Sequence, residues 1–498
     1  MAKTSYLAVD MGASSGRHIL GQFDGERIEL EEIYRYVNGP IEMNDGYYWD
    51  FPGLWADVRK GLMAAAQRCG DTIKSVGVDT WGVDYAYLDK NGQVLANPHC
   101  YRDPRTDGAM ERAFETVPRE EIFEHTGLQF IQINSLYQLL ADRWAGSVPL
   151  ANADRFMMIP DLFHWLLSGE ASNEFTDSTT TQIYDPRKGQ WAYELLKKFD
   201  LPTDIFKPVS QPGTVLGGLR PSLVKESGLA SAKVVLPGSH DTASAVMAVP
   251  TASASGTADW AYISLGTWAL MGIESSVPVV NDVVSAFNFT NEGGVGGTTR
   301  ILKNICGMWL LQECRRVWNQ QGKGYDWEDM NHLTDSAVPL RSFINPDARD
   351  FLTPTDMPEA IRAYAARTGQ PVPDDDGAIL RAALDSLAMK FRQVKTMCEK
   401  ISGQTINTIH IVGGGIRNKH LCQATADAAG CCVVTGPIEA TALGNLLVQV
   451  IASGELNSMS DARAVVRASF AGEMTTYYPH DTQRWDDAYE RFLSCFEL

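Results

Sequence analysis

The feature that most constrains the fold of this 498-residue chain is a repeated strand–turn–strand pattern, one copy in each half. VDMGASSGR (residues 9–17) and SLGTWALM (residues 264–271) are apolar strands that run into a turn of Gly with Ser or Thr and return as strands. Such a turn can point successive backbone N–H groups at a phosphate chain without a basic patch. Each copy alone is also explained as an ordinary β-hairpin. Two equivalent copies predict a duplicated fold that clamps a nucleotide.

Length, composition and charge indicate a soluble protein of two domains. The length exceeds what one core usually supports, and 44% apolar with 21% charged residues is ordinary for globular proteins. A formal charge of −18 argues against nucleic acid or an anionic membrane as a partner. Nine cysteines without C-x-x-C spacing indicate reduced thiols. With no secretory signal and no membrane-length apolar run, we expect a cytoplasmic monomer or small homo-oligomer.

Strand and helix patterns alternate along the chain, which predicts α/β layers. The expected strands cover residues 6–11, 17–23, 28–37, 75–89 with an internal loop, 261–275 with an internal Gly turn, and 406–415. The expected helices follow Asp50 to residue 63 and cover residues 135–144, 157–167, 301–312, 379–401 and 420–429. The Ser/Ala/Gly-rich run at 251–260 is typical of a domain junction. We therefore predict domains at 1–248 and 249–498.

A carboxylate stands at the exit of a predicted buried strand near the middle of the chain. In PGSHDTASAV (residues 237–246), Asp241 follows His240 and precedes a helix of small residues. A carboxylate at such a turn can accept a proton from a substrate hydroxyl. Taken alone, the same residue is also explained as an N-cap that accepts hydrogen bonds from the first free helix amides. Its place beside the junction favours two lobes that close on a small molecule.

A third glycine cluster supports the nucleotide hypothesis. IHIVGGGIRNKH (residues 409–420) combines a buried strand, three glycines and a helix. Glycines there let the backbone lie flat against a ligand, and a helix N-terminus favours negative charge. Tight strand-to-helix packing explains the glycines equally well. The segment has neither the Walker pattern nor the dinucleotide-binding spacing.

Several segments together resemble those of FGGY-type carbohydrate kinases. VDMGASSGR, the Asp of GSHDTASAV, SLGTW and VGGGIRN occur in that family's order, and the resemblance covers essentially the whole chain. SVGVDTWGVDYAYLD, YRDPRT, FTDSTTTQIYD, FTNEGG and ILKNICGMWLLQ are most similar to kinases of L-rhamnulose. Ala13 stands where the wider family more often has Thr or Ser, and Trp81-Gly82-Val83-Asp84 replaces the Arg-Glu pair of glycerol kinases. That departure argues against glycerol as substrate.

The resemblance implies an α/β fold of two actin-like, ribonuclease H-like domains with a cleft between them, the first binding sugar and the second nucleotide. It implies ATP-dependent phosphorylation of the O1 hydroxyl of a small ketose, with Asp241 as base. The residues expected around the ketose are Trp81, Gly82, His240, Thr242 and Asn304. Those expected around ATP are Ala13, Ser14, Ser15, Gly16, Arg17, Thr267, Gln312, Gly413, Gly414 and Gly415. Mg²⁺ is expected with ATP, and Asp10 is the nearest carboxylate to hold it.

Each assignment has a structural alternative. His240 is explained as well by structural hydrogen bonding, and Trp81 by the core. Asn304 and Gln312 share one face of the predicted helix, where a backbone carbonyl would serve as partner as well as a ligand. Asp79 and Asp84 could simply cap turns, and the run Thr179–Thr181 is interpreted as a solvated loop.

Two alternative functions stay open from the sequence. L-fuculose or D-xylulose could be the ketose, and a non-enzymatic actin-like ATPase is disfavoured by the Asp241 segment but not excluded by composition. A sugar-responsive repressor is disfavoured because the chain begins at the phosphate-loop strand and is strongly acidic.

Overall fold

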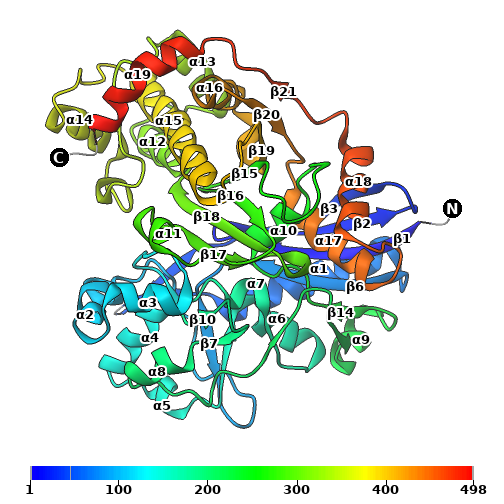
Figure 1. Cartoon of the computed structure of the whole chain (residues 1–498). Helices are drawn as coiled ribbons and strands as arrows, with labels where there is room; N and C mark the ends of the chain where they lie inside the picture. The colour runs from blue at the N-terminus through cyan, green and yellow to red at the C-terminus, as the bar shows by residue number, and fades with distance from the viewer. Residues whose placement is uncertain (1–2, 45, 496–498) are drawn as a thin grey trace. The chain divides into compact units, whose positions relative to one another are not determined.

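The computed structural model describes residues 3–44 and 46–495, and the chain divides into two compact units (Figure 1). Unit 1 comprises Met1–Gly256, Glu274–Ile301 and Ala440–Ala471. Unit 2 comprises Thr257–Ile273, Leu302–Glu439 and Gly472–Leu498. Each unit is therefore assembled from segments distant in sequence. The domain boundary expected at residue 248 stays a prediction.

Unit 1 is built on a six-stranded sheet in the order β13-β14-β6-β1-β2-β3. Its strands are β1 (Thr4–Met11), β2 (Ser15–Phe23), β3 (Ile28–Val37), β6 (Ile73–Thr80), β13 (Val215–Gly218) and β14 (Lys233–Val235). β1, β6 and β14 run parallel, whereas β2, β3 and β13 are antiparallel to their neighbours. Seven of the eight residues of β1 are buried, as expected for a strand covered on both faces.

The two faces of the sheet are covered by different helices. Val76 and Val78 of β6 lie in one apolar cluster with Val58 of α1 (Phe51–Cys69). The alternate residues of β6 face α17 (Ala440–Ala452), because Ser75 donates a hydrogen bond to Gln449 of that helix. α17 lies along the β1–β6 part of the sheet (Figure 1). This near-C-terminal helix thus belongs to the core of the first unit.

Unit 1 contains further helices and short strands around this core. The helices are α2 (Ala109–Thr116), α3 (Arg119–Thr126), α4 (Ser135–Trp144), α5 (Val148–Asn152), α6 (Ile159–Ser168), α7 (Phe175–Ser178), α8 (Tyr193–Lys198), α9 (Pro221–Ser227), α10 (Asp241–Met247), α11 (Asp282–Ala286) and α18 (Met459–Phe470). The strands are β4 (Pro40–Met43), β5 (Gly46–Trp49), β7 (Tyr85–Leu88), β8 (Arg155–Met158), β9 (Asn173–Glu174), β10 (Tyr184–Asp185), β11 (Gln190–Trp191), β12 (Val209–Ser210) and β17 (Thr290–Gly293).

The second sheet has seven strands in the order β17-β18-β16-β15-β19-β20-β21, and its central strands lie in unit 2. The remaining strands are β15 (Ala261–Leu265), β16 (Trp268–Ser275), β18 (Thr299–Cys306), β19 (Thr408–Val412), β20 (Cys432–Thr435) and β21 (Thr476–Tyr477). The helices of unit 2 are α12 (Trp309–Gln320), α13 (Trp327–Ser336), α14 (Met357–Arg367), α15 (Asp376–Ser402), α16 (Lys419–Ala429) and α19 (Thr482–Ser494).

Most elements expected from the sequence are present, but the helix predicted for residues 301–312 is wrong. Residues up to Cys306 form β18, and α12 begins only at Trp309. β18 is almost wholly buried, so its apolar run has no strand-like alternation that could distinguish it from a helix. Gly307 then turns the chain where an added Cβ would lie 2.6 Å from the Trp268 backbone. Asn304 and Gln312 therefore do not share a helix face.

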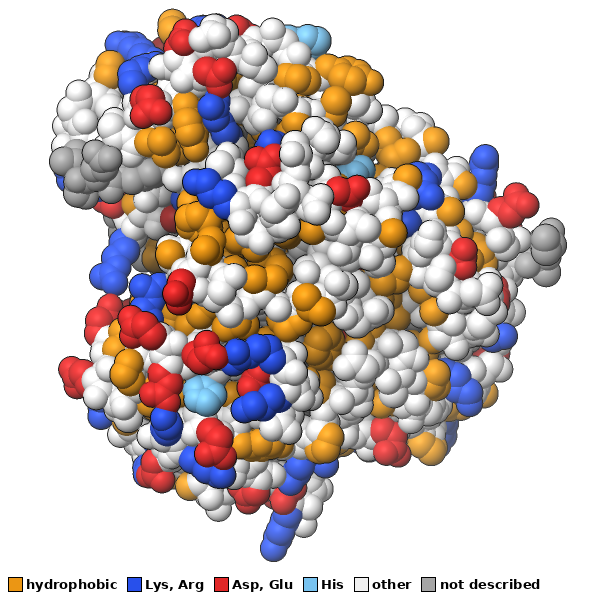
Figure 2. Space-filling model, in the orientation of Figure 1, with side chains coloured by type: hydrophobic (Ala, Val, Ile, Leu, Met, Phe, Trp, Pro, Cys, Tyr) orange, Lys and Arg blue, Asp and Glu red, His pale blue; other side chains and the backbone are white. Residues whose placement is uncertain are grey.

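On the face shown in Figure 2, acidic and basic side chains are interspersed among uncharged and apolar ones. No helix within residues 3–44 and 46–495 has the length and apolar character needed to cross a bilayer.

The close contact between α10 and α17 gives a stability prediction. A Cβ at Gly444 of α17 would lie 1.8 Å from the backbone oxygen of Ser244 in α10. A helical Gly→Ala change ordinarily stabilises a protein by roughly 0.5–1 kcal/mol. We expect Gly444→Ala instead to lower the melting temperature and the activity, because α10 carries Asp241. Thr441→Ala, a half-buried position on the same helix, is the control, and a Gly444→Ala protein as stable as this control would contradict the packing argument.

Candidate active site

The ends of three segments of unit 1 meet at one edge of its sheet. β1 and β6 are parallel, with Asp10 opposite Asp79 and Met11 opposite Thr80. The backbone N–H of Thr80 donates to the Ser239 carbonyl at 2.9 Å. Because carboxyl ends of parallel strands lie on one edge, the residues that follow all three segments are brought together. Asp10, Trp81, Gly82 and Asp241, predicted from distant motifs, thus belong to one region.

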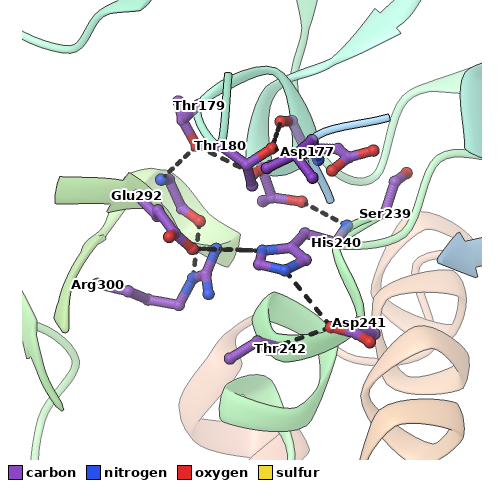
Figure 3. A network of polar contacts seen from close by, with 12 residues as sticks. Asp177, Thr179, Thr180, Ser239, His240, Asp241, Thr242, Glu292 and Arg300 are labelled. Carbon is purple, nitrogen blue, oxygen red and sulfur yellow. Dashed lines mark hydrogen bonds and ion pairs between the residues drawn. The ribbon is translucent and has the colours of Figure 1, made fainter. Parts of the chain in front are cut away.

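Asp241 is the first residue of α10, and its side chain is 34% exposed. Its Oδ1 accepts a hydrogen bond from the Thr242 hydroxyl at 3.1 Å and lies 3.4 Å from Nε2 of His240 (Figure 3). The interpretation of Asp241 as the helix cap is wrong, because His240 occupies the N-cap position and makes no side-chain capping bond. The carboxylate is therefore not the cap of α10, although the amide and hydroxyl of Thr242 both interact with it and lower its pKa against the effect of burial.

The pKa of the Asp241 carboxyl is raised above its ordinary value. Burial is the main cause, the nearby His240 opposes the rise, and the negative charge of Asp10 adds to it. Desolvation and like charges both disfavour the ionised form of a carboxyl group. A base whose pKa is raised in this way binds a proton more strongly than a solvated aspartate does.

The turn before Asp241 is held by two residues that sequence analysis did not single out. The Ser239 amide donates to Glu174 at 3.2 Å, and the His240 amide donates to the Thr176 hydroxyl at 3.1 Å. The Thr176 hydroxyl in turn donates to Glu174 at 2.7 Å. Both side chains are fully buried, and burial raises the pKa of Glu174 to about 7. Glu174 directly precedes the segment FTDSTTTQIYD (residues 175–185), and no pattern in the sequence indicated that its side chain supports the Asp241 turn.

The expectation of a solvated loop at Thr179–Thr181 is wrong. All three threonines are buried. The Thr179 hydroxyl accepts from the Gly293 amide at 2.7 Å, and the Thr180 hydroxyl accepts from the Val83 amide at 3.0 Å. Since buried hydroxyls need partners, the threonines serve here to satisfy backbone groups of other segments.

Gly82 lies in a tight turn against Thr180. A Cβ at Gly82 would come within 2.9 Å of the Thr180 hydroxyl and methyl group. The next residue, Val83, has φ +67°, which is an uncommon and strained conformation for a β-branched side chain. Such strain persists only where the surroundings impose it and is concentrated at functional sites. The contacts with Thr180 therefore fix the conformation of this turn.

Asp84 is the centre of a buried network and not a simple turn cap. Its Oδ2 accepts hydrogen bonds from the indole N–H of Trp49 at 2.7 Å and of Trp81 at 3.0 Å. The Tyr101 amide and the Gln138 side chain also donate to this carboxylate. The rings of Trp49 and Trp81 are 4.1 Å apart. Trp81 is 5% exposed, so its ring is locked in place and its polar edge is already satisfied.

The first glycine turn connects β1 to β2, as predicted. The Gly12 amide donates to the Ser15 carbonyl at 3.0 Å, and Asn38 binds the Gly12 carbonyl at 2.8 Å. Ala13 and Ser14 stand at the tip of this turn, while Ser15, Gly16 and Arg17 begin β2. The turn is thus supported from behind by Asn38, a partner that the sequence motif did not include.

Asp10 is compatible with a magnesium ion. Arg17 donates two hydrogen bonds to Asp10, both to Oδ2, at 2.8 and 3.0 Å. Asp79, opposite Asp10 in the next strand, is fully buried, and its Oδ1 has no hydrogen-bond partner among the described residues. Burial, followed by the charge of Asp10, raises the pKa of Asp79 well above its usual range. The side chain of Asp10 has the oxygen donors that hydrated Mg²⁺ prefers, whereas the raised pKa of Asp79 favours its neutral form, in which it is a poorer metal ligand.

In unit 2, the structure brings together residues predicted from three separate segments. The Thr267 hydroxyl, in the turn between β15 and β16, donates to Gln312 of α12 at 3.3 Å. β19 is parallel to β15, and a Cβ at Gly415 would collide with Leu265 at 2.2 Å. The triple glycine turn therefore lies beside the Gly266–Thr267 turn.

The three glycines of this turn have different environments. Gly413 has φ +91°, a conformation that glycine adopts without strain. A Cβ at Gly414 would meet no atom within 4 Å, so its exposed face is open to a ligand. Gly414 and Gly415 begin a 3₁₀ turn (Gly414–Arg417) that precedes α16, whose N-cap is Asn418. Asn304 lies on β18 and is half buried.

Comparison with known proteins decides the family. Residues 5–248 match the N-terminal domain, and residues 261–453 the C-terminal domain, of the FGGY family of carbohydrate kinases. The chain belongs to the FGGY family of carbohydrate kinases. A rhamnulokinase of Bacteroides thetaiotaomicron is 42% identical, covering 99% of each chain. A rhamnulokinase of Bacillus subtilis is 38% identical and covers 96% of each chain.

Solved structures of sugar kinases have the same fold. A xylulose kinase of Lactobacillus acidophilus superposes with a TM-score of 0.81 at 14% identity, covering 99% of this chain and 98% of that one. A glycerol kinase of Plasmodium falciparum gives a TM-score of 0.76 at 14% identity, covering 99% of each chain. The predicted two-domain α/β fold and the prediction of a carbohydrate kinase are confirmed. ATP and a sugar are accordingly its substrates.

The Asp84 network predicts a pH-dependent stability. Burial raises the pKa of Asp84 from 3.8 to about 6, and its four donors only partly oppose this rise. The folded state therefore holds this proton more tightly than the unfolded state. Protonated Asp84 therefore contributes about 3 kcal/mol to the free energy of unfolding below pH ~4, and this contribution is lost as the pH rises through ~6.

Asp84→Asn should remove this dependence, because asparagine has no proton to lose. The measurement is chemical denaturation of wild type and variant between pH 4 and 7.5. The difference between the two free energies of unfolding, wild type minus Asp84→Asn, should fall by about 3 kcal/mol as the pH rises across this range. A difference that is constant with pH would show that Asp84 is ionised at all these pH values in the folded protein.

Proposed function

We propose that this FGGY kinase transfers the γ-phosphoryl group of ATP to the O1 hydroxyl of L-rhamnulose, forming L-rhamnulose 1-phosphate in L-rhamnose degradation. The observation that carries the choice of sugar is the 42% identity to a rhamnulokinase over 99% of both chains. The site of unit 1 supports the reaction class, because it presents a partly exposed carboxylate, Asp241, whose pKa is raised.

In this proposal Asp241 is the general base. Its Oδ1 is occupied by Thr242 and faces His240, so Oδ2 is the atom that accepts the O1 proton. As the O1–P bond forms, the bond between the γ-phosphorus and the bridging oxygen breaks and ADP leaves. This transfer has little covalent character of its own, so positioning and charge neutralisation dominate catalysis.

The ketose is proposed to contact residues near Asp241 on unit 1. Gly82, His240 and Thr242 supply hydrogen-bonding groups, and the locked ring of Trp81 supplies an apolar wall, which suits the methyl group of a 6-deoxy sugar. Asn304 is proposed as a further sugar contact from β18. Because the indole N–H of Trp81 is bound to Asp84, this ring offers the sugar only its apolar surface.

ATP is proposed to contact the glycine turns. On unit 1 these are Ala13, Ser14, Ser15, Gly16 and Arg17; on unit 2 they are Thr267, Gln312, Gly413, Gly414 and Gly415. Backbone N–H groups in such turns bind phosphate without a basic patch. Asp10 would hold Mg²⁺, which would neutralise charge on the phosphates when bound. We also propose a cytoplasmic location, with no nucleic acid or membrane partner, as a monomer or small homo-oligomer.

A coupled assay for ADP release across a ketose panel tests the substrate. We expect kcat/KM for L-rhamnulose to exceed that for L-fuculose and D-xylulose by at least tenfold, since a binding difference of about 1.4 kcal/mol suffices for this factor. ³¹P NMR should show the phosphate on O1. A preference for another ketose of the panel would overturn the choice of sugar while leaving the kinase assignment intact.

Asp241→Asn tests the base. Loss of a general base should lower kcat by about 10²–10⁴-fold, while ATP and ketose binding measured by calorimetry stay close to wild type. Asp185→Asn changes another buried carboxylate of unit 1, one that accepts from the Arg187 and Lys188 amides, and should retain near wild-type turnover. Turnover of Asp241→Asn within a few-fold of wild type would refute the assignment.

A further inference from the structure

His240 connects Asp241 to a buried ion pair that no motif predicted. Its Nε2 lies 3.4 Å from Asp241, and its Nδ1 lies 3.3 Å from Glu292 (Figure 3). Arg300 from β18 reaches the same place, with Nη2 at 3.1 Å from Nδ1 of His240 and 3.2 Å from Oε2 of Glu292. Arg300 is also tied to the backbone by a 2.9 Å bond from Nε to the Gly293 carbonyl.

Hydrogen-bonding rules determine where the imidazole carries its proton. A guanidinium group only donates and stays charged in proteins. Nη2 of Arg300 is within hydrogen-bonding distance of Nδ1 of His240, and Oε2 of Glu292, 3.2 Å from the same nitrogen, is its ion-pair partner. Nδ1 then acts as an acceptor, and the hydrogen of a neutral ring lies on Nε2. That nitrogen faces the carboxylate of Asp241, which needs a donor.

The opposite tautomer is unfavourable in this geometry. A hydrogen on Nδ1 would face the N–H of Arg300 at 3.1 Å. A carboxylate oxygen faces each ring nitrogen, Asp241 at 3.4 Å from Nε2 and Glu292 at 3.3 Å from Nδ1, so the donor group of Arg300 beside Nδ1 is what distinguishes the two tautomers. Arg300 therefore selects one tautomer, and Glu292 supplies the charge that keeps the guanidinium in place.

The ion pair of Arg300 and Glu292 is almost completely buried, and a gain in protein stability does not by itself explain such burial. Arg300 is 0% exposed and Glu292 is 5% exposed. Burial raises the pKa of Glu292, but the charge of Arg300 outweighs burial and holds this pKa below its usual value, so the pair is ionised. Replacing buried ion pairs by apolar residues is often neutral or stabilising. Because this pair contacts His240, the residue next to the proposed base Asp241, its burial is instead explained by a role in positioning the imidazole ring.

We propose that Glu292 and Arg300 are positioning residues for phosphoryl transfer, which hold His240 with its hydrogen on Nε2 so that Asp241 presents its other oxygen to the sugar. The part of this inference that concerns phosphoryl transfer rests on the proposed function. The tautomer itself is a property of the free enzyme and is measured without substrate. The two parts can therefore fail separately.

The test replaces Arg300 in the full chain and measures both the ring and the reaction. ¹⁵N NMR of the histidine-labelled protein reports the protonation of each ring nitrogen, and His240→Gln identifies the His240 signals among the nine histidines. We expect Nδ1 of wild-type His240 to be unprotonated and to gain a proton in Arg300→Met. In the same variant kcat should fall by about 10–100-fold, a loss typical of disturbed positioning, while KM for ATP stays within about twofold. Arg300→Lys retains a donor and should recover part of kcat.

Glu274→Gln is the matched control, because Glu274 and Arg463 form another buried ion pair in unit 1. This variant should lose stability but keep the His240 signals and kcat. An Arg300→Met protein with an unprotonated Nδ1 and normal kcat would overturn the proposal, as would an equal loss of kcat in Glu274→Gln. If wild type shows no ketose-dependent ADP release but the tautomer changes as expected, the substrate proposal fails and the positioning of Asp241 by Arg300 stands.

Discussion

The hydrogen bond from the Thr80 amide to the Ser239 carbonyl is the link on which the site of unit 1 depends. It joins the end of β6 to the turn that carries Asp241. Since β6 also pairs in parallel with β1, this one contact completes a row of three chain segments that end at the same edge. Asp10, Gly82 and Asp241 lie together because the backbone is paired in this way.

Glu174, Thr176 and Asp84 support this edge with buried side chains that are hydrogen-bonded to neighbouring segments. Glu174 and Thr176 hold the amides of residues 239 and 240, and Asp84 holds the two tryptophan rings near Gly82. Buried polar groups are costly unless every member has a partner, and a satisfied network is correspondingly rigid. Rigidity at this point suits a reaction in which position and charge, not covalent chemistry, supply most of the rate.

Local patterns were sufficient to predict many of the elements. The strand at Tyr6 and the helix after Asp50 have clear apolar patterns and turn signals, and both are present. The strand that contains Asn304 was mistaken for a helix, because β18 is buried on both faces and its sequence TRILKNIC does not alternate between apolar and polar residues. The alternative explanation of Asp241 as an N-cap is wrong, because the helix begins one residue earlier than a cap at this position would require.

By itself, the sequence determined the duplicated α/β architecture, the two glycine turns and the choice of Asp241, because those features are encoded in short runs of neighbouring residues. Only the tertiary structure decided which residues support them. Thr176, Glu292 and Arg300 are far from Asp241 in the chain, and their contacts with His240 exist only after the segments have packed. Burial likewise changed the role of Asp84 from a turn residue to the centre of a network, since removal from water obliges a carboxylate to collect donors.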